Sequence, residues 1–130
     1  MDDFTLACLE AALWSSNTDA DGHPMDEYYG IEDIAEESLA RLTADCQRFQ
    51  ESAAWHAAIE GEDPRTNERR LQFYPIEASA GHDFWLTRNG HGAGFWDGDW
   101  TEPHGTALDK LAKSFGQVDL YVGDDGRIYC

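Results

Sequence analysis

The stretch Asp83-Phe-Trp-Leu-Thr-Arg-Asn-Gly-His-Gly-Ala-Gly-Phe-Trp-Asp97 decides the fold that we expect for this chain. Its apolar residues alternate with a period of two on both sides of Asn89-Gly90, a dipeptide that favours a two-residue β-turn. A hairpin with that turn at its tip has an inward face composed of Phe84, Leu86, Ala93 and Phe95. The pattern therefore predicts an antiparallel hairpin over residues 83–97.

Two further segments of the C-terminal half favour β-structure, and a third favours a helix. Residues 71–76 are a candidate strand, which Pro75 restricts to an edge or an end of a sheet. Residues 118–122 and 127–129 are predicted to form a second hairpin around the turn-forming sequence Gly123-Asp-Asp-Gly126. Residues 106–115 have the apolar spacing of a short amphipathic helix that ends at Gly116.

The N-terminal half has the pattern of helices. Residues 4–15 and 31–50 carry apolar side chains at three- and four-residue spacing, and residues 51–60 are rich in alanine. Residues 16–30 and 61–70 contain the turn-forming and polar residues of loops. We expect one domain over residues 1–130, with an acidic helical part over 1–60 and a β-rich part over 71–130. The predicted class is α+β, with acidic N-terminal helices packed on a small antiparallel sheet of two hairpins and one further short helix.

The chain is strongly acidic, and its charge is unevenly distributed. It has 130 residues, with 26 Asp and Glu against 9 Lys and Arg, a net charge of −17. Residues 1–63 carry 16 carboxylates against two arginines, a net charge of −14, and residues 64–130 carry ten carboxylates against seven cations, a net charge of −3. Direct binding of nucleic acid or of an anionic membrane is therefore not expected, because both need clustered Lys and Arg. The expected partner is a basic protein.

The cysteines and the N-terminus indicate a reducing cytoplasm. Cys8, Cys46 and Cys130 are odd in number and widely spaced, unlike the disulfide framework of a small secreted domain. Cys8 and Cys46 fall on apolar stripes and are predicted core residues. The chain begins with no secretory signal and has no apolar run long enough to span a membrane.

Histidines and aspartates gather in and beside the predicted 83–97 hairpin: His82, Asp83, His91, Asp97, Asp99 and His104. Zinc sites usually contain closely spaced ligand pairs, and the predicted register separates His82 from His91. Residues 17–28 match only the first part of a calcium-binding loop, because Tyr28 stands where a bidentate glutamate is needed. We therefore expect no metal, no cofactor and no enzymatic activity. A small His/Asp- or metal-dependent enzyme on the 82–97 hairpin is the alternative.

Five stretches carry a resemblance to known proteins: Ala12-Leu-Trp-Ser-Ser16, Ile31-Glu-Asp-Ile34, Ala44-Asp-Cys46, the stretch Gly81-His-Asp to Phe95-Trp-Asp97, and Val118-Asp-Leu-Tyr-Val-Gly-Asp-Asp-Gly126. In these stretches the chain resembles a family of small proteins encoded by tailed phages and prophages of proteobacteria. The resemblance implies a phage accessory protein that is made in the host cytoplasm. Strongly acidic accessory proteins of phages include DNA mimics that block restriction enzymes or CRISPR complexes.

Charge and resemblance together suggest an inhibitory protein that binds a basic host nucleic-acid-binding complex through its acidic helical surface. Anti-CRISPR or anti-restriction action by nucleic-acid mimicry is the expected mechanism, because a groove of Lys and Arg recognises phosphate charge largely without sequence. The expected partner-binding residues are Asp19, Asp21, Asp26, Glu27, Glu32, Asp33, Glu36 and Glu37. A structural phage protein that forms a homodimer through an aromatic sheet face around Trp85 and Trp96 is a further alternative.

Overall fold

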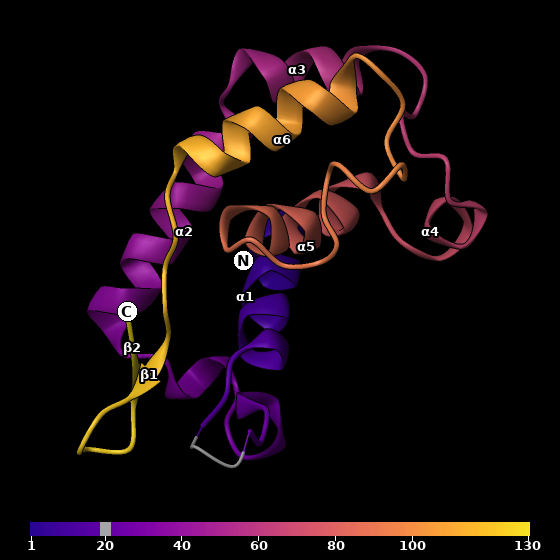
Figure 1. The fold of residues 1–130 in the computed structure, drawn as a ribbon. Helices are drawn as coiled ribbons and strands as arrows, with labels where there is room; N and C mark the ends of the chain where they lie inside the picture. The colour runs from indigo at the N-terminus through magenta and orange to yellow at the C-terminus, as the bar shows by residue number, and fades with distance from the viewer. Residues whose placement is uncertain (19–21) are drawn as a thin grey trace.

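Two apolar helices cross at the centre of the molecule, and the other elements surround this crossing (Figure 1). The computed structural model describes residues 1–18 and 22–130. The helices are α1 (Asp3–Ser15), α2 (Glu36–Gln50), α3 (Ala53–Glu60), α4 (Glu68–Phe73), α5 (Ile76–Arg88) and α6 (His104–Ser114), with 3₁₀ turns η1 (Met25–Glu27) and η2 (Ile31–Asp33). Strands β1 (Tyr121–Val122) and β2 (Ile128–Tyr129) form a small antiparallel sheet. The predicted α+β class is confirmed, with helices predominating.

Helices α1 and α5 approach so closely that only glycine fits at the contact. A Cβ atom on Gly81 would clash with the backbone carbonyl oxygen of Phe4. Helix α1 begins where the sequence predicts, because the side chain of Asp2 accepts a hydrogen bond from the backbone N–H of Thr5 at 2.8 Å. The crossing of α1 and α5 therefore fixes the centre of the fold.

An aromatic core fills the space between α1, α2 and α5. The ring of Phe49 lies 5.2 Å from that of Phe4, 4.8 Å from that of Phe84 and 5.7 Å from that of Phe95. Cys8 and Cys46 are buried in the same core, as the sequence predicts. The N-terminal helices and the middle of the chain thus share one apolar core.

The predicted 83–97 hairpin is wrong, because residues 76–88 form helix α5 and residues 89–97 form a loop. Asn89 and Gly90 end this helix instead of turning a hairpin. Gly90 has φ +71°, its N–H donates to the Thr87 carbonyl, and the N–H of His91 donates to the Leu86 carbonyl at 3.0 Å. This is a Schellman cap, which needs a residue with positive φ as a type I′ turn does. The same dipeptide therefore fits both structures.

The predicted strand over 71–76 is also wrong. Helix α4 extends to Phe73, and Tyr74 and Pro75 are extended residues that separate it from α5. Pro75 disfavours a helical conformation in the residue before it, which is why the two helices do not merge. Of the two predicted hairpins, only the second is formed: Tyr121 pairs with Tyr129, and Val122 with Ile128.

The helix predicted over 31–50 is interrupted near its start. Residues 31–33 form the 3₁₀ turn η2, and Ile34 and Ala35 are extended before α2 begins at Glu36. This break has a tertiary cause, because the N–H of Ala35 donates to the carbonyl of Ile128 in β2 at 2.8 Å. The C-terminal hairpin is thereby attached to the start of α2. The helices predicted over 4–15, 51–60 and 106–115 are confirmed to within two residues at each end.

Substitution of Gly90 tests the cap at the end of α5. Gly90→Ala is expected to lower the free energy of unfolding by about 1 kcal/mol, because a Cβ atom is disfavoured at positive φ. Gly92→Ala is the matched control, since Gly92 has no positive φ and a Cβ atom added to it would meet no atom within 4 Å. Urea unfolding of both variants measures the difference. Equal stabilities would contradict a conformational requirement at Gly90.

Candidate functional site

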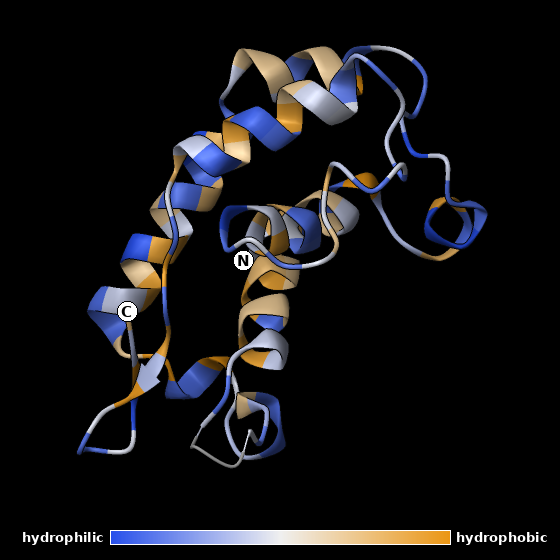
Figure 2. Cartoon of the chain, viewed as in Figure 1, coloured by the Kyte–Doolittle hydropathy of each residue, from blue (hydrophilic) through white to orange (hydrophobic). Residues whose placement is uncertain are grey.

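The segment from η1 through η2 to the start of α2 lies in the lower part of the molecule in Figure 1 and is largely hydrophilic in Figure 2. It carries exposed carboxylates. We call this set of side chains the acidic end: Asp26, Glu27, Glu32, Glu36 and Glu37. In the described part of the chain, none of the five is within ion-pair distance of a cation. Their charges therefore face solvent without internal compensation.

Three of the predicted partner-binding residues do not belong to this exposed set. Asp33 is half-buried, and its carboxylate accepts a hydrogen bond from the backbone N–H of Gly30 at 2.8 Å, which stabilises η2. Asp19 and Asp21 lie outside the described residues. The structure thus brings five of the eight predicted residues to one end of the molecule as exposed charges.

The C-terminal hairpin adds carboxylates that were not assigned to this surface from the sequence. The side chain of Asp125 accepts hydrogen bonds from the hydroxyl of Tyr129 at 2.6 Å and from the backbone N–H of Arg127 at 3.0 Å, and Asp124 is exposed beside it. The hydrogen bond to Asp125 raises the pKa of Tyr129, and the negative charge of Glu37 adds to this effect. The backbone N–H of Cys130 donates to the hydroxyl of Ser38 at 3.1 Å, which holds the hairpin beside the start of α2 although the two are far apart in the sequence.

Two arginines of the C-terminal half, Arg65 and Arg88, point inward, whereas Arg69 and Arg127 are exposed. Arg65 is buried, and it donates to the Asp63 carboxylate, the Tyr74 carbonyl and the Ser79 hydroxyl. Arg88 is buried on the other side of α5, where it donates to Asp45 at 2.9 Å. Because these guanidinium groups are satisfied internally, they do not neutralise the carboxylates of the acidic end.

Asp83 is the centre of the most enclosed charged cluster in the described residues. Its side chain has no exposed surface and accepts two hydrogen bonds from Arg70, at 2.7 and 2.8 Å. Trp100 donates its indole N–H to the same carboxylate at 2.7 Å, and Nδ1 of His82 lies 3.1 Å from it. Burial raises the pKa of Asp83, but these hydrogen bonds outweigh it and lower the pKa below its usual value.

The lowered pKa of Asp83 predicts a component of stability that is lost in acid. A carboxyl group with a lower pKa in the folded state stabilises the fold fully above its unfolded pKa of about 3.9, and progressively less as the pH falls through the folded value. The free energies of unfolding of the wild type and of Asp83→Asn, measured with urea, should therefore differ most at neutral pH. We expect this difference in free energy to become smaller below about pH 4. A difference in free energy that increases on acidification would contradict a lowered pKa of Asp83 in the folded state.

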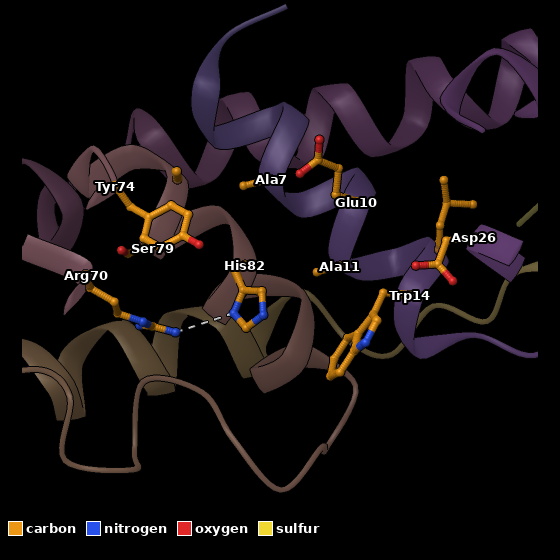
Figure 3. A pocket seen from close by; sticks show the side chains of 11 residues that line it. Ala7, Glu10, Ala11, Trp14, Asp26, Arg70, Tyr74, Ser79 and His82 are labelled. Atoms are coloured by element: carbon orange, nitrogen blue, oxygen red, sulfur yellow. Dashed lines mark hydrogen bonds between the residues drawn. The ribbon is translucent and has the colours of Figure 1, made fainter. Parts of the chain in front are cut away.

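A groove of about 660 Å³ lies between α1 and α5, beside the Asp83 cluster. Figure 3 shows Arg70 and Tyr74 at one end and Trp14 and Asp26 at the other, with His82 between them. The side chains that line it are Ala7, Glu10, Ala11, Leu13, Trp14, Asp26, Arg70, Tyr74, Ala78, Ser79 and His82. Sequence reasoning missed this groove, because it depends on α5, part of which was predicted as a strand.

The histidines singled out in the sequence are dispersed. His82 lines the groove, whereas His104 begins α6 and lines a separate hollow of about 510 Å³ that also contains Glu60 and Glu62. His91 follows the cap of α5. In residues 1–18 and 22–130, no group of three or more His, Cys, Asp or Glu side chains is placed to hold a metal ion. The calcium-type pattern of residues 17–28 includes residues outside this description.

The aromatic sheet face expected around Trp85 and Trp96 is not formed. Trp85 is only 2% exposed in α5, and its indole N–H donates to the hydroxyl of Ser15 at 2.9 Å. Trp96 is 54% exposed in the loop that follows α5. Because one ring is in the core and neither residue belongs to a sheet, the expected homodimer face does not exist. Each described helix is too short or too polar to cross a membrane.

Comparisons with known proteins add no relative to this description. No protein-family model, no curated protein and no solved structure matches the chain significantly.

Proposed function

We propose that this chain is a phage-encoded inhibitory protein that binds a basic nucleic-acid-binding complex of the host. The acidic end is the proposed contact surface, and nucleic-acid mimicry with anti-CRISPR or anti-restriction activity in the host cytoplasm is the proposed mechanism. One observation carries the proposal: exposed, uncompensated carboxylates from η1, η2 and α2 gather at one end, whereas Arg65 and Arg88 are buried.

The physics of such an interaction depends on collective charge. A nucleic-acid-binding groove presents Lys and Arg that neutralise phosphates, and it binds them largely without regard to sequence. Carboxylates on short, rigid elements present a similar array of negative charge, and the summed field speeds association. Glu36 and Glu37 are held on the first turn of α2, where the helix dipole also favours negative charge.

A His/Asp-dependent enzyme is the second candidate, because Nδ1 of His82 lies 3.1 Å from Asp83 at the edge of a groove. Against it, the Asp83 carboxylate is already shared with Arg70 and Trp100, which reduces its ability to make the imidazole a stronger base. The two candidates differ in one variant. His82→Ala should leave inhibition intact if the acidic end is responsible, and should abolish activity if the protein is an enzyme of this kind.

The experiment that tests the proposal measures phage survival. Bacteria with a defined CRISPR or restriction system are challenged with a targeted phage, with and without expression of this chain. We expect expression of this chain to raise the plating efficiency of the targeted phage. In vitro, the purified target complex should release its bound DNA in proportion to the amount of this chain added. A target that binds DNA and this protein at the same time would contradict mimicry.

A further inference from the structure

We propose that the groove between α1 and α5 receives an arginine side chain of a polypeptide partner. The inference deepens the proposed function and rests on it for the identity of the partner as a basic protein. It assigns to the groove a ligand of one chemical class, the guanidinium group. Three properties of the groove support this assignment: its shape, its aromatic wall and its charge.

Small apolar side chains line the middle of the groove. Its lining includes the small residues Ala7 and Ala11 on α1 and Ala78 on α5, so the helices leave a channel that the aliphatic part of an arginine fills. Trp14 and Tyr74 also line it and are more than half exposed, at 56% and 58%. Each of these exposed rings gains buried apolar area when a side chain packs against it.

The Trp14 end of the groove is negative. Glu10 and Asp26 are both exposed and both line the groove. Figure 3 shows Asp26 at the Trp14 end and Glu10 between this end and Ala7, with its carboxylate turned away from the indole ring. The opposite end contains Arg70, but its guanidinium is neutralised by two hydrogen bonds to Asp83. An anionic ligand therefore finds no free positive group among the lining residues, whereas a cation finds two carboxylates.

Guanidinium matches this lining better than other cations. Its planar face stacks on an indole ring such as that of Trp14, and its five N–H donors serve two carboxylates at once. A lysine ammonium is compact and strongly hydrated, and it gains less from stacking on an aromatic face. Asp26 also belongs to the acidic end, so an arginine in the groove continues the same contact surface.

The test uses the free protein and a tripeptide, acetyl-Gly-Arg-Gly-amide. NMR should show millimolar binding that shifts the indole N–H of Trp14 and the methyl groups of Ala7 and Ala11. The citrulline tripeptide, which is neutral and nearly isosteric, should cause no such shifts. Trp14→Ala is expected to weaken binding about fivefold, the effect of losing about 1 kcal/mol of cation–π attraction. Glu10→Gln with Asp26→Asn should also weaken binding about fivefold, because two exposed ion pairs are lost.

The matched control is Glu36→Gln with Glu37→Gln, which removes the same number of charges from outside the groove. Arginine binding by this control should stay within about twofold of wild type, since only long-range, salt-screened attraction is lost. Equal shifts with the citrulline tripeptide, or no shift at Trp14, would overturn the inference. If arginine does not bind the groove but Glu36→Gln with Glu37→Gln weakens binding to the basic target about fivefold, the proposed function holds without this inference. If the groove binds arginine and the same variant binds the target as tightly as the wild type, the acidic end is not the contact surface.

Discussion

Asp83→Ala is expected to lower the free energy of unfolding by about 3–5 kcal/mol, the usual cost of removing one partner of a buried ion pair. The carboxylate is fully buried, and its loss leaves the guanidinium of Arg70 and the indole N–H of Trp100 without their shared acceptor. The indole N–H of Trp100 would then be buried without an acceptor, and the Arg70 guanidinium would lose the carboxylate that neutralises it. Urea unfolding followed by circular dichroism measures the loss.

Asp99→Ala is the control for this prediction, because its carboxylate lies 4.0 Å from the same arginine but is 31% exposed. Burial and the neighbouring charge of Asp97 raise the pKa of Asp99, so its ionised form is not favoured by the fold. We expect a change within about 0.5 kcal/mol for this variant, as for most surface substitutions. Similar losses from Asp83→Ala and Asp99→Ala would show that burial does not determine the strength of the cluster.

The parts of the fold that could be predicted from the sequence are those with local signals. Helix α1 has an aspartate cap at Asp2 and an apolar stripe, and both act within a few residues. The C-terminal hairpin has the turn sequence Gly123 to Gly126 between short apolar segments. Such signals do not depend on the rest of the molecule, so the elements that they predict are present in the structure.

Helix α5 could not be recognised in this way, because it is buried on nearly all sides. From Ser79 to Arg88 nearly every residue is buried, so the helix lacks a polar face and shows no period of 3.6. Phe84 and Leu86 are core residues, as the hairpin interpretation required, but they are buried by a helix and not by a sheet. An apparent period of two then arises by chance, and Asn89-Gly90 supports either structure.

The candidate site was only partly accessible from the sequence, for a related reason. Composition predicts an acidic surface, and Glu36 and Glu37 lie on it. It does not predict that Asp33 caps η2, or that hydrogen bonds from Ala35 to Ile128 and from Cys130 to Ser38 hold the hairpin beside the start of α2. These contacts depend on the tertiary structure, so they cannot be predicted from the spacing of residues along the chain.

Two arginines are buried in the fold, whereas the carboxylates of the acidic end are exposed. Arg88 reaches Asp45 across 43 residues, and Arg65 binds carbonyl groups of α4 and its C-terminal residue. Each uses its positive charge to hold the fold, so neither is available to neutralise the acidic end. This separation makes the acidic end experimentally tractable, because its glutamates are not needed for the internal network.

Neutralising the acidic end is expected to weaken binding to the basic target about 30-fold without unfolding the protein. The variant replaces four exposed glutamates with glutamine: Glu27, Glu32, Glu36 and Glu37. At about 0.5 kcal/mol for each exposed ion pair, the four together contribute about 2 kcal/mol, which corresponds to about 30-fold in Kd. Asp33 is left unchanged, because its carboxylate accepts the hydrogen bond of Gly30.

A second variant with the same change of net charge separates local contact from overall acidity. It replaces four exposed glutamates on or near other elements: Glu51, Glu60, Glu62 and Glu68. Helix α3, which contains Glu60, lies at the opposite end of the molecule from η2 (Figure 1). If the acidic end is the contact surface, this variant should bind within about threefold of wild type at physiological salt, where charges beyond about 8 Å are screened. Equal weakening by the two variants would mean that net charge, and not the placement of these carboxylates, attracts the partner.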